Sequence, residues 1–377
     1  MNDPAFILHI GRHKSGTSSL QAYLAGHPER LAAEGILYPR AGRQGVAHHA
    51  VAGVLQQRAM REDPQRADTT LRQFHQALAL EWQAQPARRV LLSSEAFQNA
   101  RAEDVAAAFD PRRSSVIVYL REQADYLVSS YQQVVHARQH AAELAAYGNG
   151  TGVDYDHFLA GWEAAWPGAA LQVGVYARQA LLRSNVIDDF FARLGIEVDA
   201  SDEPQDRNPS IGGALLELKR LLNARLPVER WPQGLYQAFS HAAGTHPALR
   251  RRPALAPALA DQVRAHCAAS NAEVARRRFD REQLFQHLPT VSHDHALGFE
   301  DFRLALQALL QARREVALCV VEALLATAGL DTTRRERIVA QFEADNTEPY
   351  RRVLRRLARQ GAGGDWVWNF PVPELAE

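Results

Sequence analysis

Residues 5–19, AFILHIGRHKSGTSS, join a short apolar run to a helical pattern through a loop that lies between two glycines. The apolar run at residues 5–10 is typical of a buried strand. From Gly16 onward the apolar side chains recur with a helical period, and hydroxyl side chains are good N-caps at a helix start. The stretch therefore predicts a strand, a loop and a helix, with N-terminal caps offered by Thr17, Ser18 and Ser19.

The same alternation of strands and helices continues for about 200 residues, after which the pattern is mostly helical. Such alternation is typical of a parallel α/β sheet, whose ligand site lies at the carboxyl ends of the strands. We therefore expect an α/β core over residues 1–200 and a helical extension over residues 201–377. The expected strands are residues 5–10, 89–93, 115–120 and 171–176, and expected helices include residues 68–84, 102–109 and 123–140.

The composition excludes several classes of protein. The 377 residues carry 43 basic and 43 acidic side chains, and this zero net charge gives no overall attraction to nucleic acid or an anionic membrane. Two cysteines cannot form a disulfide framework. The N-terminus has acid where a signal peptide has base, and no stretch approaches about 18 apolar residues. We expect a cytoplasmic protein with no integral membrane segment and no nucleic-acid partner; the oligomeric state stays open.

Lysine is rare in this chain, since Lys14 and Lys219 are the only two among the 43 basic residues. Either cation serves on a solvated surface, so a lysine in a loop points to its own chemistry. Lys14 lies in a loop with the parts of a phosphate cradle, because glycines let the backbone approach an anion and the helix N-terminus adds positive potential. Lys219 lies in a helical pattern and is expected on a helix surface.

The loop departs from a Walker A motif. Gly11 and Gly16 stand at the right interval, but Thr17 stands where that motif has its lysine. Neither apolar run, at residues 89–93 or 115–120, ends in aspartate. Both features argue against a magnesium-dependent NTPase. A glycine-containing turn with a chance lysine is the structural alternative.

Arg121 directly follows the strand expected at residues 115–120, and Ser129 stands eight residues later. If a helix begins near Gln123, Ser129 lies about two turns along it, on the face that Arg121 can overhang. A guanidinium and a hydroxyl suit a terminal phosphate, although a strand-end arginine and a surface serine would explain the same residues. Together with the Lys14 loop, the pair indicates a nucleotide with phosphates at two separate ends.

The motifs HIGRHKSGTSSLQ and VIVYLREQADYLVSSY resemble those of the nucleotide-dependent sulfotransferases, whose donor is 3′-phosphoadenosine 5′-phosphosulfate (PAPS). The resemblance is specific over residues 5–31 and 88–135. It implies a P-loop-like sheet and transfer of a sulfuryl group to a hydroxyl or amine acceptor, with no metal. The implied donor-binding residues are Arg12, His13, Lys14, Ser15, Gly16, Thr17, Ser18 and Ser19 at the 5′ end, and Arg121 and Ser129 at the 3′ end.

The resemblance also implies catalytic roles. Lys14 would stabilise charge on the departing phosphate, and a base would take the acceptor proton. Glu95, 26 residues before Arg121, occupies the slot of a strand-end base in one branch of the family. A glutamate there would equally cap the next helix or pair with an arginine. His48 and His49 are competing bases, because neutral histidine is apt near pH 7.

The acceptor is left open by the sequence, with a small molecule, a glycan, a lipid or a natural product as candidates and the helical extension as the expected cover of its site. Thinner resemblance continues at residues 207–210 and 271–285, and residues 359–366 look like a late loop that covers the 3′-phosphate in one branch. The alternatives to a sulfotransferase are a P-loop kinase or NTPase that uses ATP with magnesium, and a non-catalytic nucleotide-binding scaffold.

Overall fold

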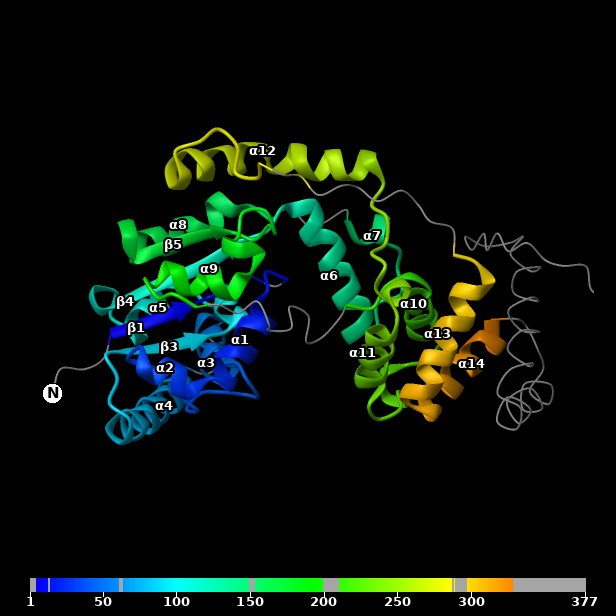
Figure 1. Cartoon of the computed structure of the whole chain (residues 1–377), viewed down its shortest axis with the longest axis horizontal. Helices are drawn as coiled ribbons and strands as arrows, with labels where there is room; N and C mark the ends of the chain where they lie inside the picture. The colour runs from blue at the N-terminus through cyan, green and yellow to red at the C-terminus, as the bar shows by residue number, and fades with distance from the viewer. Residues whose placement is uncertain are drawn as a thin grey trace, which may run out of the picture. The chain divides into compact units, whose positions relative to one another are not determined.

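The computed structural model describes residues 5–12, 14–60, 64–148, 153–198, 210–286, 288 and 297–327. The chain divides into two compact units that interleave along the sequence (Figure 1). The first comprises residues 1–126, 152–207 and 263–289, and the second comprises residues 127–151, 208–262 and 290–377. The units therefore do not meet at one boundary near residue 200.

A five-stranded, all-parallel sheet lies in the first unit, in the order β2-β3-β1-β4-β5. The four strands that the sequence predicts are confirmed to within one residue. The unpredicted strand, β2, has two residues, which is too short for any hydrophobic period to show. The strands are β1 (Ala5–His9), β2 (Ile36–Leu37), β3 (Arg89–Ser93), β4 (Ser114–Leu120) and β5 (Leu171–Val175).

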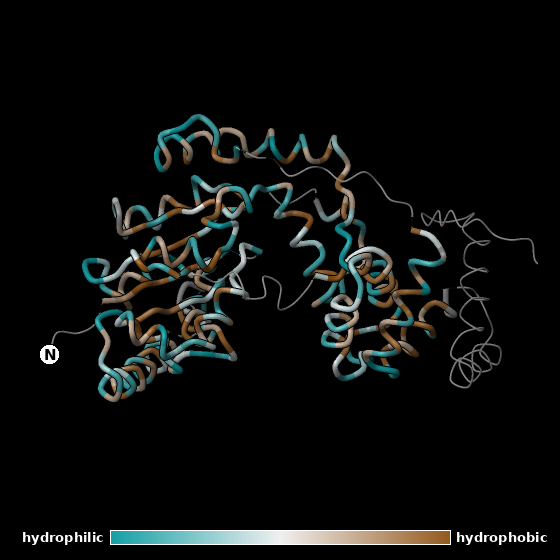
Figure 2. The backbone as a smooth tube through the Cα atoms, in the orientation of Figure 1, coloured by the Kyte–Doolittle hydropathy of each residue, from teal (hydrophilic) through white to brown (hydrophobic). Residues whose placement is uncertain are grey.

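Helices pack on both faces of this sheet. Alternate residues of a strand face opposite sides, so Ile7 and Leu8 of β1 enter two different apolar cores. The core around Ile7 includes α1 (Thr17–Gly26), α2 (Pro28–Ala33) and α9 (Val186–Arg193). The core around Leu8 includes α3 (His49–Met60), α4 (Pro64–Ala84), α5 (Ala102–Ala108) and α8 (Tyr155–Ala165). The expected α/β class is confirmed. Figure 2, in which the backbone trace is coloured by residue hydropathy, shows mainly hydrophobic residues along the strands.

The strand order reverses at β1. From β1 the chain passes to β2 and β3 on one side, and then to β4 and β5 on the other. In open parallel sheets, ligands bind at such a switch point, beyond the carboxyl ends of the strands. The segments at this position follow β1, β3 and β4, and they carry Lys14, Glu95 and Arg121 respectively.

The described part of the second unit is helical. It contains α7 (Leu144–Gly148), α10 (Gly213–Arg225), α11 (Leu235–Thr245), α13 (Phe299–Ala312) and α14 (Arg314–Thr327). Two helices continue from one unit into the other, α6 (Gln123–Ala137) and α12 (Pro257–Phe279). The described residues of the two units also form short 3-10 helices, which are η1 (Glu95–Asn99), η2 (Pro111–Arg113), η3 (Gly168–Ala170), η4 (Leu182–Ser184), η5 (Val228–Arg230) and η6 (Pro247–Arg250).

The sequence predicts Lys219 on a helix surface, and this prediction is wrong. The side chain is fully buried in α10. Its ammonium group donates to the carbonyl of Val135, at 3.2 Å, and to the side-chain oxygen of Asn223. It also lies 4.1 Å from the ring centroid of Trp231. Asn223 in turn donates to three carbonyls around the end of α6. The second lysine therefore ties two helices of the second unit together.

None of the helices within the described ranges is long and apolar enough to cross a membrane.

Candidate functional site

The loop after β1 has an unusual backbone. Lys14 has φ 65° and Gly16 has φ 76°, both in the left-handed region. For lysine this conformation costs about 1 kcal/mol, whereas glycine adopts it freely. The turn between Arg12 and Ser15 is closed by the backbone N–H of Ser15, at 3.3 Å from the Arg12 carbonyl, and by its hydroxyl, at 2.6 Å. Left-handed residues in such a turn point successive N–H groups into an anion-binding concavity.

Gly11 allows this loop to fold closely against its neighbours. A Cβ atom at residue 11 would lie 2.5 Å from the Thr17 methyl carbon and 3.5 Å from the Cα of Glu95. The loop therefore contacts both the start of α1 and the segment after β3. His13, one of the expected donor-binding residues, lies outside the described residues.

The N-terminus of α1 differs from the sequence prediction. Gly16 is its N-cap, no side chain caps it, and no acidic residue lies in its first turn. Of the three expected caps, Thr17 and Ser19 are buried and Ser18 is exposed. The first N–H groups of the helix thus keep their positive potential uncompensated by a local carboxylate, which suits an anionic ligand.

Arg121 lies against the same loop, a contact that the sequence does not predict. Its guanidinium group donates to the carbonyl of Lys14 and, at 2.5 Å, to the carboxylate of Asp125. It also lies 5.6 Å from the ring centroid of Tyr176. These contacts hold a cation at the edge of the Lys14 loop.

Ser129 is buried in α6, which begins at Gln123 as the sequence predicts. It belongs to the second unit, whereas Arg121 belongs to the first. Their joint contact with a 3′-phosphate therefore stays a prediction.

Arg12 packs on aromatic side chains of α8. Its guanidinium carbon lies 4.5 Å from the ring centroid of Phe158 and 5.5 Å from that of Tyr155. Its Nε is buried and has no hydrogen-bond partner among the described residues. The Tyr155 hydroxyl donates to the carbonyl of Arg121, so these side chains join the loops after β1 and β4.

Side chains of α12 hold the segment at Arg121 in place. In the sequence, only the weaker resemblance at residues 271–285 links this helix to the site. Gln123 and Asn271 exchange two amide hydrogen bonds, of 2.7 and 3.0 Å. Arg264 donates to the carboxylate of Glu122 at 3.1 Å. Only periodicity in α12 is visible from the sequence, so neither bond could be predicted.

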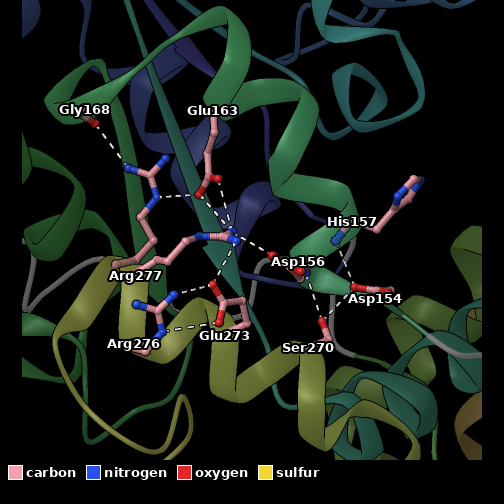
Figure 3. Close-up of polar contacts among 10 residues, drawn as sticks. Asp154, Asp156, His157, Glu163, Gly168, Ser270, Glu273, Arg276 and Arg277 are labelled. Carbon is pink, nitrogen blue, oxygen red and sulfur yellow. Dashed lines mark hydrogen bonds and ion pairs between the residues drawn. The ribbon is translucent and has the colours of Figure 1, made fainter.

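An ionic network anchors the same part of α12 to α8, as Figure 3 shows. Arg277 contacts Asp156 at 2.7 Å and Glu163 at 3.1 Å, while Arg278 contacts Glu163 at 2.8 Å. The position of α12 in the first unit is thereby fixed on both sides of Asn271.

Replacement of Asn271 by leucine is expected to lower the free energy of unfolding by about 1–3 kcal/mol. The buried amide of Gln123 would lose both hydrogen bonds to Asn271 and keep only the 3.4 Å bond from its Nε2 to the carbonyl of Val153. Chemical denaturation measures this change. Arg276→Ala is the matched control on the same helix, since its ion pair with Glu273 is exposed to solvent and contributes little to stability. An equal loss for both variants would show that the amide pair does not hold the segment.

Glu95 lies beside one of its two expected competitors. Its carboxylate accepts a hydrogen bond from the buried amide of Gln21 at 3.0 Å and lies 3.8 Å from Nε2 of His49. Nδ1 of His49 lies 2.8 Å from the hydroxyl of Ser94. Glu95 and His49 are about one-fifth and one-third exposed, so both reach solvent. The two residues form one acid–base pair.

His48 is engaged inside the protein. Its side chain is fully buried, its Nδ1 accepts the backbone N–H of Ser93 at 3.1 Å, and its Nε2 lies 3.1 Å from the carbonyl of Pro39. Burial lowers the pKa of His48 to about 3. A histidine with both nitrogens occupied and no solvent exposure is poorly placed to accept a proton from a substrate.

His9, the last residue of β1, is a buried polar residue that sequence reasoning did not single out. It is fully buried, and its Nδ1 lies 2.8 Å from the hydroxyl of Ser93. Its Nε2 has no hydrogen-bond partner among the described residues. Burial lowers the pKa of His9 to about 4, partly offset by the charge of Glu95. In the sequence it is one position of an apolar strand, and no local signal distinguishes it.

Two further predictions cannot be located. Residues 207–209 and the late loop at 359–366 lie outside the described residues. Within the described ranges, no group of three or more His, Cys, Asp or Glu side chains is arranged to hold a metal ion.

Comparisons with known proteins leave the chain without a family. No protein-family model and no solved structure matches it. It is similar to an uncharacterized protein of Archaeoglobus fulgidus, with 31% identity over 152 residues. That match covers 38% of this chain and 41% of the relative, so the chain spans less than half of the relative's length. The function must be argued from the residues of the site.

Proposed function

We propose that this protein is a PAPS-dependent sulfotransferase with a P-loop-like core. The observation that carries the proposal is the convergence of three segments at the carboxyl edge of the sheet. The Lys14 loop contacts the guanidinium group of Arg121 on one side and the backbone of Glu95 on the other. In this proposal a phosphate cradle and a half-buried base lie side by side, as transfer between a nucleotide and an acceptor requires.

The residues after β1 suit the phosphate end of the donor. The uncapped start of α1 and the left-handed residues Lys14 and Gly16 favour an anion. A Cβ at Gly11 would collide with the methyl carbon of Thr17, at 2.5 Å, so the loop needs glycine at this position. When bound, PAPS supplies the sulfuryl group. Lys14 offers a point charge to the phosphate that departs, and Arg121 and Ser129 are the proposed contacts of the 3′-phosphate.

Glu95 and His49 are proposed to remove the acceptor proton. As the acceptor oxygen bonds to sulfur and the bond from sulfur to the phosphate oxygen breaks, the proton passes to this pair. Gln21 donates to one carboxylate oxygen of Glu95, and Ser94 fixes the ring of His49. If His49 accepts the proton, the nearby carboxylate of Glu95 stabilises the resulting imidazolium; if Glu95 accepts it, the carboxylate becomes a neutral acid.

Separate replacement of the two residues identifies the base. Glu95→Gln has a side chain of nearly the same size, with an oxygen that can still accept from Gln21, but it cannot take a proton. Turnover is therefore expected to fall by about 10²–10⁴-fold if Glu95 is the base. In that case His49→Gln costs about tenfold or less. Rates of nucleotide release, measured from pH 5 to pH 9, compare the variants. A larger loss in His49→Gln would assign the proton to His49, and wild-type rates in both would exclude the pair.

The proposed activity is tested by transfer of sulfur-35 from labelled PAPS to fractions of a bacterial lysate, without added magnesium. Label in a fraction together with equimolar release of 3′-phosphoadenosine 5′-phosphate (PAP) is the expected result. Transfer of phosphorus-32 from γ-labelled ATP with magnesium would instead favour a kinase. Tight PAP binding with no transfer to any fraction would favour a non-catalytic scaffold.

A further inference from the structure

The loop between β2 and α3, residues 38–48, is held firmly at its outer side by α4. The carboxylate of Glu81 accepts the backbone N–H of Arg40 at 2.7 Å and that of Ala41 at 2.6 Å. Charge-assisted hydrogen bonds of this kind are about twice as strong as neutral ones. A carboxylate that binds two successive N–H groups fixes the backbone of the loop.

The inner side of the loop is built around Tyr38 and connects to the candidate base. The Tyr38 hydroxyl donates to the carbonyl of Val46 at 2.7 Å, and its ring meets the ring of His48 edge-on, with centroids 4.7 Å apart. The backbone N–H of His48 donates to the carbonyl of Ser93 at 2.8 Å. The loop is therefore attached to the end of β3, next to Glu95.

Arg43 lies on this loop and has no anionic partner in the part of the chain that the structure describes. Its guanidinium carbon lies 5.3 Å from the ring centroid of Tyr38, and its side chain is half-buried. No carboxylate among the described residues pairs with it. Arg278, another half-buried arginine of the first unit, differs from Arg43 in having a carboxylate partner. A cation that is partly removed from water and stacked on a ring is well suited to bind an anion.

Tyr38 connects Arg43 with the surroundings of the candidate base. The guanidinium carbon of Arg43 lies 5.3 Å from the Tyr38 ring centroid, and the same ring packs on His48, the residue before His49. Burial raises the pKa of Tyr38, the positive charge of Arg43 opposes this shift, and the negative charge of Glu95 adds to it. His48, which contacts Tyr38, likewise feels the charges of Arg43 and His49. The arginine and the candidate base thus belong to the same neighbourhood.

We propose, on the basis of the proposed sulfotransferase function, that Arg43 binds an anionic group of the acceptor. The acceptor would then be an acidic sugar, or another hydroxyl compound that carries a carboxylate or a sulfate ester. The hydroxyl of the acceptor would reach Glu95 and His49 while the anionic group of the acceptor forms hydrogen bonds with the guanidinium group of Arg43. A carboxylate base alone would repel such an acceptor. The unpaired arginine offsets that repulsion at a separate point and thereby orients the acceptor.

Binding to the PAP-saturated protein tests this inference with two probes that differ mainly in charge, 4-nitrophenyl β-D-glucuronide and 4-nitrophenyl β-D-glucoside. Titration calorimetry is expected to show about tenfold or greater preference for the glucuronide. Arg43→Gln should remove most of that preference, with the affinity for the glucoside changed by less than about threefold. Arg72→Gln, an exposed arginine on α4, is the control and should retain the preference.

The outcomes separate the two proposals. If PAP does not bind, the sulfotransferase proposal fails, and this inference fails with it. If PAP binds normally but the protein does not prefer the glucuronide, or if Arg43→Gln keeps the preference, only the role of Arg43 is overturned. Normal PAP affinity in Arg43→Gln shows that the variant is folded. Repeating the titration with a sulfated glucoside distinguishes the two kinds of anionic group.

Discussion

Lys14→Ala is expected to reduce turnover of PAPS by about 10²–10³-fold, because one preorganised charge at the departing group typically supplies that factor. PAP affinity should fall by about tenfold or more, since a hydrogen bond to a charged group contributes about 1.5–3 kcal/mol. Release of PAP measures the rate, and calorimetry measures the affinity. Wild-type turnover in this variant would remove Lys14 from the mechanism.

The backbone of Lys14 provides a matched control. Lys14→Gly removes the same ammonium group but relieves the left-handed strain at φ 65°. It should therefore be as inactive as Lys14→Ala, yet more stable than that variant by about 1 kcal/mol. If the glycine variant were active and the alanine variant inactive, the loop backbone, and not the charge, would be responsible.

The second large effect is expected at Lys219, whose burial lowers its pKa from 10.5 to about 7. Between these two values the unfolded chain binds a proton that the folded protein does not bind. The free energy of unfolding therefore rises with pH in this window, by about 1.4 kcal/mol per pH unit. Below pH 7 both states bind the proton, and Lys219 then causes no further change with pH. Between pH 7 and pH 9.5 this amounts to about 3 kcal/mol.

Lys219→Met removes the titrating group and should flatten this rise. Urea unfolding of wild type and variant at pH 7 and at pH 9.5 gives the difference, in which the other titrating groups cancel. Neutral lysine still has two hydrogens for its two acceptors, Val135 and Asn223, so the fold does not require the charge. Arg72→Ala should keep the wild-type slope. The same slope in Lys219→Met would mean that this lysine stays charged in the folded protein.

Short-range patterns in the sequence predict much of the α/β unit. The four longer strands can be predicted because each is a continuous apolar run, and the loop with Lys14 and Gly16 can be predicted because glycine and lysine stand out there. The two-residue strand β2 has no period, and α8 was missed in a segment without a clear pattern. The contents of the strands could thus be predicted, but their order could not.

Long-range contacts explain what the sequence could not show. Gln123 and Asn271 are 148 positions apart, so their pairing leaves no local signal. His48 and His49 are adjacent in sequence, yet the start of α3 turns one inward and brings the other to Glu95. The role that the rarity of lysine suggests for Lys14 stays a prediction, and the surface position expected for Lys219 from its helical pattern is wrong.

Thermal unfolding with candidate nucleotides tests the central proposal most directly. A ligand that binds only the folded protein stabilises it by about 2.7 kcal/mol at one hundred times its Kd. PAP without magnesium is expected to raise the Tm by several degrees. Adenosine 5′-phosphate, which lacks the 3′-phosphate, should raise it less, and ATP with magnesium should have little effect. Stabilisation by ATP with magnesium and none by PAP would contradict the assignment of the Lys14 loop to a sulfotransferase donor.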